Sequence, residues 1–195
     1  MAEGVIVALG DSLTFGFPYS PGSSWVAEAE ALLGRPIVNR GVNGEASFDM
    51  AARVKEDVLS LQPACVVILA GSNDALRGGV RWAETETSLL ALAAAVEEVG
   101  AQVVFGLPPA LDDPAAEERL KRQRAWLKEE APRRGWTLID FFTPLLDPAT
   151  GRIRSQLTVD GVHPTREGYR RMGQAAAEVL AGLGFGSSGA QKGKA

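Results

Sequence analysis

The sequence predicts an α/β protein, a three-layer α/β/α flavodoxin-like sandwich built on a five-stranded parallel sheet. The first observation behind this prediction is the regular alternation of short apolar runs with longer amphipathic stretches. The second is that the short runs are apolar throughout, without polar residues at alternate positions. Strands that helices cover on both faces have this pattern, so we expect a parallel sheet with the strand order 2-1-3-4-5.

The predicted elements follow one another in regular order. Five short runs rich in Val, Ile, Leu and Phe are the expected strands, at residues 5–9, 36–39, 65–70, 102–107 and 137–141. Five amphipathic stretches are the expected helices, at residues 24–33, 48–61, 85–99, 114–134 and 165–183. Ser23 or Ser24 is the expected N-cap of the first helix, and Gly34 and Gly100 follow the expected ends of two helices.

Length and composition indicate a single domain. The 195 residues are 46% apolar and 23% charged, ordinary values for a globular protein with a buried core. We assign this domain to residues 1–185. Residues 186–195 are rich in Gly, Ser and Lys and are expected to form a flexible tail.

Charge and residue content narrow the possible partners. The net charge is −4 and the Lys and Arg residues are scattered, so we expect no nucleic-acid partner. With one Cys and one His, we expect no zinc cluster. Cys65 lies in a predicted buried strand and is expected to be a core residue.

The N-terminal segment and the apolar runs indicate where in the cell the protein is expected. No apolar stretch approaches the ~20 residues that a membrane span requires. The first apolar run has no basic segment before it and leads directly into Gly10-Asp11-Ser12. We interpret this run as a first strand and not a signal peptide, and we expect a cytoplasmic protein.

Candidate functional residues follow three of the predicted strands. Ser12 follows the first strand, Gly44 the second and Asn73 the third, while Asp160 and His163 lie in the loop before the last helix. In open α/β sheets, functional sites lie at the carboxyl ends of the strands, near the point where the strand order reverses. We therefore expect these side chains to share one edge of the sheet.

Ser12, His163 and Asp160 have the residue types of a nucleophile, a general base and a carboxylate that orients the base. A serine hydroxyl needs a base to take its proton, and His163 is the only histidine in the chain. Asp160, three residues earlier, can reach the Nδ1–H of the imidazole and leave Nε2 free as the base. Each residue also has a structural interpretation: Ser12 as a helix or turn cap, His163 as a hydrogen-bonded structural residue and Asp160 as a turn residue.

Gly44, Asn73 and the backbone of Ser12 are candidate donors for an oxyanion hole. Acyl transfer places negative charge on the former carbonyl oxygen, and preorganised N–H groups must meet it. Gly44 and Ser12 can offer backbone N–H groups, and Asn73 can offer its side-chain amide. The alternatives are loop geometry for Gly44 and a turn position for Asn73.

Four motifs in this order resemble those of a known family. Residues 10–13 (Gly-Asp-Ser-Leu), 39–45, 71–74 (Gly-Ser-Asn-Asp) and 160–164 (Asp-Gly-Val-His-Pro) resemble the conserved blocks of the GDSL esterases and lipases, or SGNH hydrolases. The resemblance implies a three-layer α/β/α fold and hydrolysis of ester or thioester bonds without a metal or cofactor. Carried over residue by residue, it implies a catalytic Ser12, His163 and Asp160 and an oxyanion hole made by Ser12, Gly44 and Asn73.

We therefore expect a serine hydrolase that acts through an acyl-enzyme on small-molecule esters or thioesters with short to medium acyl chains. The chain is most similar to the lysophospholipase, thioesterase and arylesterase branch. A carbohydrate O-deacetylase of the same family stays open as an alternative. So does a non-enzymatic flavodoxin-like module that binds phosphate or a nucleotide on helix N-termini. That module would leave Asp160 and His163 without a role.

Two further segments are candidates for the border of the substrate site. Residues 107–111 (Leu-Pro-Pro-Ala-Leu) follow the fourth strand and could form an apolar acyl wall or a rigid proline-rich turn. Arg77 and Trp82 lie just beyond Asn73 and could also border the site. The sequence does not determine the oligomeric state.

Overall fold

The computed structural model describes residues 3–186 and confirms the predicted parallel sheet. Within these residues the order of the five-stranded sheet is β2-β1-β3-β4-β5, and every neighbouring pair is parallel. The strands are β1 (Val5–Gly10), β2 (Ile37–Gly41), β3 (Pro63–Leu69), β4 (Gln102–Leu107) and β5 (Thr137–Asp140). The order reverses at β1, which lies between β2 and β3.

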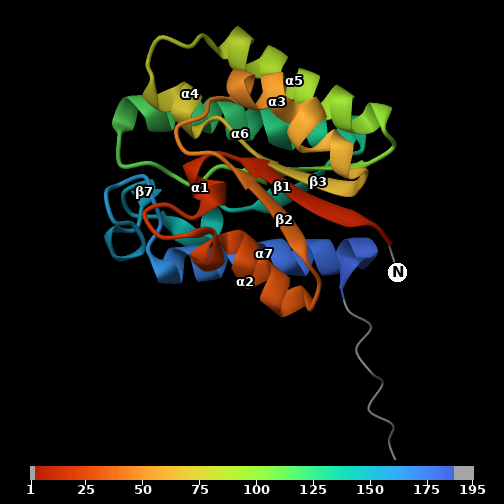
Figure 1. Cartoon of the computed structure of the whole chain (residues 1–195). Helices are drawn as coiled ribbons and strands as arrows, with labels where there is room; N and C mark the ends of the chain where they lie inside the picture. Colours follow the sequence, from red (N-terminus) through yellow and green to blue (C-terminus); the bar gives the residue numbers. More distant parts are fainter. Residues whose placement is uncertain (1–2, 187–195) are drawn as a thin grey trace, which may run out of the picture.

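Helices cover both faces of the sheet and make three layers (Figure 1). One face is covered by α2 (Trp25–Leu33) and α7 (Arg166–Leu180). The other face is covered by α3 (Ser47–Asp57), α5 (Trp82–Glu98) and α6 (Pro114–Arg134). Alternate side chains of each strand enter the two apolar layers, which is why the strands are apolar at every position. In β1, Ile6 and Ala8 face α2 and α7, whereas Val7 and Leu9 face the other layer.

The observed elements agree closely with the predicted ones, and the largest differences lie at helix ends. The strand at 102–107 and the helix at 114–134 have the predicted bounds. The predicted helix at 48–61 ends at Asp57 and continues as a 3-10 turn, η2 (Leu59–Leu61). The helix predicted to begin at residue 85 begins at Trp82, because the Glu84 carboxylate accepts the Arg81 N–H and caps it.

Several short elements of the structure were not predicted from the sequence. Helices α1 (Ser12–Phe15) and α4 (Ser72–Leu76) each begin where a strand has just ended, at β1 and β3. A small hairpin, β6 (Leu146–Asp147) and β7 (Arg152–Ile153), precedes the segment that contains His163. The remaining turns are η1 (Pro21–Ser23), η3 (Thr143–Leu145), η4 (Ser155–Leu157) and a π-helical turn, η5 (Ala181–Phe185). All are too short to show a hydrophobic period.

Other sequence expectations can be placed on the fold. Cys65 is buried in β3, and burial raises the pKa of its thiol to about 12, so the residue is a core side chain. Among the described residues no helix combines the length and apolarity needed to cross a membrane. Of the predicted tail, only Gly186 falls within the described residues.

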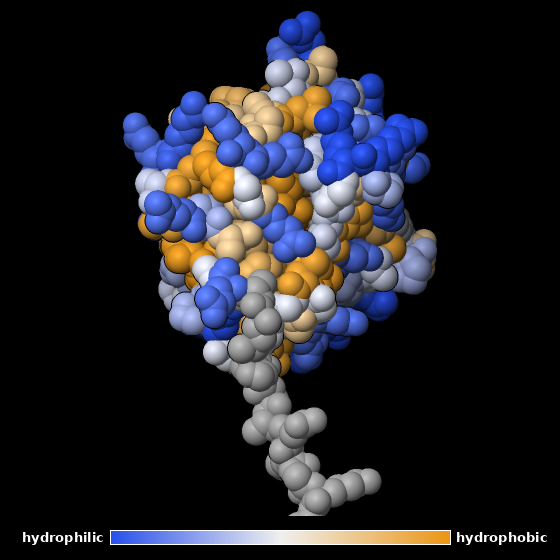
Figure 2. All heavy atoms as spheres, turned by 90° about the vertical axis from the view of Figure 1, so that its right-hand side faces the viewer, coloured by the Kyte–Doolittle hydropathy of each residue, from blue (hydrophilic) through white to orange (hydrophobic). Residues whose placement is uncertain are grey.

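The predicted site residues lie at only one of the two ends of the sheet. Figure 2 shows the end near the N-terminus, where apolar patches are broken up by polar and charged side chains. The opposite end, at the carboxyl ends of the strands, carries the predicted site residues, together with α1 and α4.

Helices α2 and α7 pack so closely that a side chain is excluded at their crossing. A Cβ atom at Gly173 of α7 would lie 2.3 Å from the Glu28 Cβ and 3.0 Å from the Trp25 carbonyl oxygen. Glycine at this position therefore sets the separation of the two helices.

Gly173→Ala should force these helices apart. We expect the free energy of unfolding to fall by about 1–3 kcal/mol, the usual range for overpacking, measured by urea denaturation. Gly182→Ala is the matched control, because no atom lies within 4 Å of a Cβ atom built there. A Gly173→Ala variant as stable as the wild type would contradict this interpretation.

Candidate active site

Ser12 is the first residue of α1, and the preceding residue performs the capping that Ser12 could have performed. The Asp11 carboxylate accepts the Leu13 N–H at 2.9 Å, which makes Asp11 the N-cap. The Ser12 hydroxyl is therefore not used in the cap. Within residues 3–186 the Ser12 N–H has no hydrogen-bond acceptor, as expected at the first position of a helix.

The hydroxyl of Ser12 meets the imidazole of His163, which in turn meets the carboxylate of Asp160. The Ser12 Oγ lies 3.0 Å from His163 Nε2, and His163 Nδ1 lies 2.7 Å from Asp160 Oδ2. With the proton on Nδ1, the imidazole donates to Asp160 and leaves Nε2 to accept from Ser12. The structure thus brings Ser12 together with His163, which lies 151 residues later in the chain, and with Asp160.

The charge of Asp160 is stabilised by its own turn. Partial burial works to raise the pKa of Asp160, but the backbone N–H groups of His163 and Val162 and the His163 imidazole outweigh it and hold the pKa below its usual value. The two backbone N–H groups donate to Oδ1 at 2.7 and 3.0 Å. Asp160 is therefore ionised at any pH at which the imidazole is neutral.

The loop that carries Asp160 and His163 is a tight turn closed by hydrogen bonds. The His163 carbonyl accepts both the Val159 N–H and the Thr158 hydroxyl at 2.9 Å. Gly161 has a φ of +86°, and a Cβ atom there would lie 2.8 Å from the Asp112 Cβ. Glycine is thus required for the turn that folds Asp160 back onto His163.

Phe17 packs against the imidazole and was not predicted as a site residue. The two ring centroids lie 4.6 Å apart, at an interplanar angle of 59°. The Phe17 carbonyl accepts the Tyr169 hydroxyl at 2.7 Å, which fixes the backbone beneath the ring. An aromatic residue five positions after Ser12 was the available signal in the sequence, but nothing in the pattern says that it reaches His163.

Asn73 contacts Asp11, the residue before Ser12, and Glu45, the residue after Gly44. Its Nδ2 donates to the Glu45 carbonyl at 2.8 Å and makes a longer contact of 3.3 Å with Asp11 Oδ2. The contact with Asp11 is the longer and therefore the weaker of the two. Gly44 has a φ of +83°, and its N–H has no acceptor among the described residues.

The loops that bear Gly44 and Asn73 are joined by a buried carboxylate. Asp74 accepts the Ser47 N–H at 2.9 Å, the Ser47 hydroxyl, and the Thr85 hydroxyl at 3.2 Å. These bonds tie the beginnings of α3, α4 and α5 together. Because every oxygen of Asp74 is hydrogen-bonded, the residue has a structural role beside the site.

Asp11 is a second buried carboxylate, directly beneath Ser12. Its side chain is 1% exposed, and burial raises its pKa to about 7, helped by the charges of Asp74 and Glu45 and opposed by the Leu13 N–H. Its deprotonated form is therefore costly in this position. Asp11 also contacts the Asn73 amide, so its protonation state affects the environment of that amide.

The predicted borders of the site are placed differently from the expectation. Leu107, Ala110 and Leu111 are buried, and Leu111 packs in a small cluster with Ala75 and α6. Residues 107–111 are buried throughout, which favours the rigid proline-rich turn over the acyl wall. Trp82 lines a cavity of about 190 Å³ behind α4, and none of Ser12, Asn73 or His163 lines it.

A second hollow borders the outer side of the Asp160 turn. It has a volume of about 460 Å³ and is lined by Asp160, Gly161, the β6–β7 hairpin and neighbouring loop residues. Within residues 3–186, no group of three His, Cys, Asp or Glu side chains is placed to hold a metal ion.

Comparisons with known proteins agree on one family. A sequence model described as the GDSL-like Lipase/Acylhydrolase family matches residues 8–171. Among curated proteins, the chain is 26% identical to Esterase TesA of Pseudomonas aeruginosa over 179 residues, which cover 88% of this chain and 85% of TesA.

Solved structures with the same architecture include proteins of that family. A G-D-S-L family protein from Desulfitobacterium hafniense is 28% identical, with a TM-score of 0.84 over 91% of this chain and 100% of the other. LAE5, an alpha/beta hydrolase enzyme from the metagenome of Lake Arreo in Spain, is 25% identical, with a TM-score of 0.81 over 96% and 98% of the two chains.

Asp11→Asn should change how stability depends on pH. The folded chain retains the Asp11 proton up to about pH 7, whereas an unfolded Asp releases it near pH ~3.9. The folded state thus binds more protons in this window, and the contribution of Asp11 to the free energy of unfolding falls as pH rises, by ~1.4 kcal/mol per pH unit.

Urea denaturation of both proteins from about pH 5 to pH 8 measures this effect. We expect the stability of the wild type relative to Asp11→Asn to decrease up to about pH 7 and then to level off. A difference that stays constant across the range would contradict the raised pKa.

Proposed function

The chain belongs to the GDSL-like lipase/acylhydrolase family and is a hydrolytic enzyme, and we propose that it cleaves carboxylic esters or thioesters through Ser12, His163 and Asp160. The observation that carries this proposal is the continuous hydrogen-bonded path from the Ser12 Oγ through the imidazole to the Asp160 carboxylate. Its three groups have the order and the reach of a nucleophile, a base and an orienting acid.

In the first half of the reaction, the Ser12 Oγ attacks the acyl carbonyl while His163 Nε2 takes the hydroxyl proton. Asp160 keeps the imidazole in the tautomer that accepts at Nε2, and its charge stabilises the imidazolium that forms. The imidazolium then gives its proton to the leaving alcohol or thiol. Phe17 covers one side of the imidazole and limits its rotation.

The negative charge of the tetrahedral intermediate is received by the N–H groups of Ser12 and Gly44 and the Asn73 amide. Two of these donors are backbone groups without an acceptor among the described residues. The third, Asn73, exchanges its long contact with Asp11 for the oxyanion. Preorganised donors of this kind each contribute about 10²–10³ in rate.

In the second half, water takes the place of the alcohol. His163 accepts a proton from the water, which attacks the acyl-Ser12 ester, and then returns a proton to the Ser12 Oγ as the acid leaves. Apart from the substrate and this water, the cycle uses only the chain's own residues.

Exposed apolar side chains at the same end of the molecule support an acyl substrate. Five large apolar side chains that are more than a third exposed follow the carboxyl ends of β1, β2 or β3 or lie in the His163 loop: Phe17, Val42, Phe48, Leu76 and Val159. This distribution favours short to medium acyl chains, as in lysophospholipase, thioesterase or arylesterase activity, over an acetylated sugar.

Replacement of the nucleophile tests the reaction class. Ser12→Ala should lower ester hydrolysis by at least about 10³-fold, because the hydroxyl that forms the acyl-enzyme is absent. A fluorescent organophosphonate should label the wild type stoichiometrically at Ser12, as read by mass spectrometry. Ser60→Ala, an exposed serine of η2, is the matched control and should be fully active.

The same measurements separate the alternatives. Wild-type activity in Ser12→Ala would refute the mechanism, and an unreactive Ser12 combined with tight nucleotide binding would indicate a binding module. We expect p-nitrophenyl esters of rising chain length and acyl-CoA to be better substrates than acetylated sugars. The opposite ranking would indicate a carbohydrate O-deacetylase.

Asp160→Asn tests the orientation of the base. The amide can still contact the imidazole but favours the wrong tautomer, so kcat should fall by about 10³–10⁴-fold with little change in KM. Asp147→Asn is the matched control, because the Asp147 carboxylate accepts the Ala149 N–H in the nearby hairpin and does not contact His163. Equal kcat values for the two variants would contradict the assigned role of Asp160.

A further inference from the structure

The proposed oxyanion donors Gly44 and Asn73 come from two separate segments. Gly44 lies in the loop between β2 and α3, and Asn73 lies in α4. The bonds that join these segments at Glu45 and Ser47 all lie on the carboxyl side of Gly44. Another contact is therefore needed to set the orientation of Gly44 itself.

Gly44 is otherwise weakly held. No atom lies within 4 Å of a Cβ atom built at this residue, and its φ of +83° is open to glycine but strained for other residues. The neighbouring turn is closed by a long bond of 3.4 Å between the Glu45 N–H and the Val42 carbonyl. The peptide that follows Gly44 can thus rotate unless its carbonyl is fixed.

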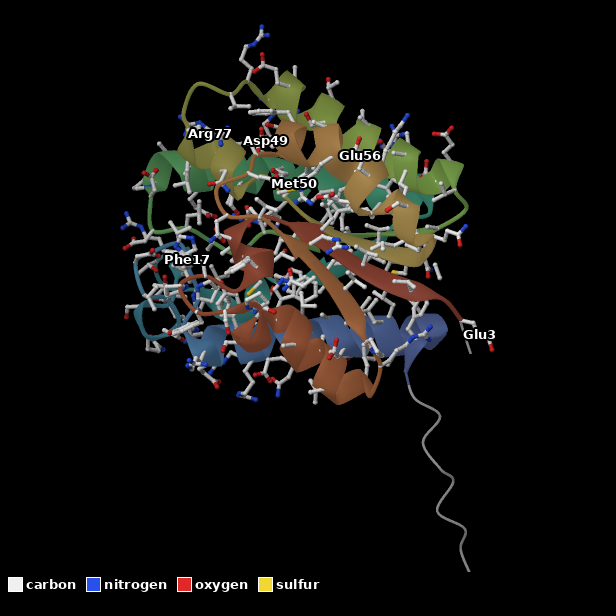
Figure 3. The ribbon with its side chains drawn as sticks, in the orientation of Figure 1. Glu3, Phe17, Asp49, Met50, Glu56 and Arg77 are labelled. Carbon is white, nitrogen blue, oxygen red and sulfur yellow. The ribbon has the colours of Figure 1, made fainter. Side chains whose placement is uncertain are left out.

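Arg77, at the end of α4, supplies that contact. Its Nη2 donates to the Gly44 carbonyl at 2.8 Å. The guanidinium is held from the α3 side by Asp49, at 3.7 Å, and lies 5.5 Å from the centre of the Phe48 ring. Figure 3 shows Arg77 and Asp49 at the same end of the molecule as Phe17, at the catalytic edge.

We propose that Arg77 is a positioning residue that joins α4 to the Gly44 carbonyl and so holds both oxyanion donors in place before substrate binds. The inference rests on the proposed function, because it needs Gly44 and Asn73 to be the donors. Arg77 binds the carbonyl that follows the donating N–H, so it fixes the backbone of Gly44 and leaves the N–H free.

The exposure of Arg77 separates this role from a stabilising one. The side chain of Arg77 is 45% exposed and that of Asp49 is 36% exposed. Ion pairs of this kind contribute little to the stability of a protein. A small misplacement of a catalytic donor, in contrast, lowers the rate strongly. Loss of Arg77 should therefore affect turnover and leave stability almost unchanged.

The test compares Arg77→Met with Arg77→Lys and with Arg81→Met in the full chain. Met keeps the apolar stem but cannot donate, whereas Lys can still donate one hydrogen bond. Arg81 is the matched control, because it forms an exposed ion pair with Glu84 in the same connection. Each variant is assayed with a neutral and an anionic p-nitrophenyl ester, with a neutral organophosphonate, and by thermal unfolding.

We expect Arg77→Met to lower kcat about 10-fold on both esters with KM nearly unchanged, and to slow inactivation by the phosphonate by a similar factor. Arg77→Lys should recover part of the loss, and Arg81→Met should match the wild type. The melting temperatures should agree within the error of measurement.

Three results would overturn the proposal for Arg77. Wild-type kcat in Arg77→Met would show that Gly44 needs no such contact. A rise in KM confined to the anionic ester would make Arg77 a substrate-binding residue, and a loss of activity that tracks a loss of melting temperature would make it structural. Ser12→Ala, assayed in parallel, keeps the two hypotheses apart: if it retains activity, the proposed function itself fails.

Discussion

The position of β1 between β2 and β3 is the constraint on which the rest of the site depends. In a parallel sheet all strands end at one edge, and the order β2-β1-β3 makes the loops after these strands neighbours. Ser12 in α1, Gly44 in a loop and Asn73 in α4 are far apart along the chain and lie in the segments that follow these three strands. The His163 turn reaches the same edge because α7, which follows it, packs against α2 on the adjoining face.

Where the strands end at this edge, hydrogen bonds from side chains take over from the backbone hydrogen bonds of the sheet. Arg53 of α3 donates to the carbonyl of Gly10, the last residue of β1, and to that of Arg40, one residue before the end of β2. It also pairs with Glu45. Together with Asp74, this arginine holds the loops in fixed relative positions. Asp11 is buried at the same edge, close to the Asn73 amide, and this burial raises the pKa of its carboxyl group to about 7.

The apolar strands and the amphipathic helices made the fold predictable, because burial on both faces leaves an unambiguous pattern. The meeting of Ser12, His163 and Asp160 followed from topology and spacing. Phe17 and Arg77 could not be found in this way, because their roles come from side-chain reach across loops. Helices α1 and α4 are too short to have a period. The cytoplasmic location and the absence of a nucleic-acid partner stay predictions.

The chain has one histidine, and it is the residue that we propose as the base, with its Nε2 at 3.0 Å from the Ser12 Oγ. Its imidazole is therefore a built-in reporter. A proton spectrum contains a single pair of histidine ring signals, which need no assignment by mutagenesis, and a reagent that acylates imidazoles has one target. The protonation state of the reacting group can thus be followed directly in the unmodified protein, with an inhibitor bound to Ser12 or without one.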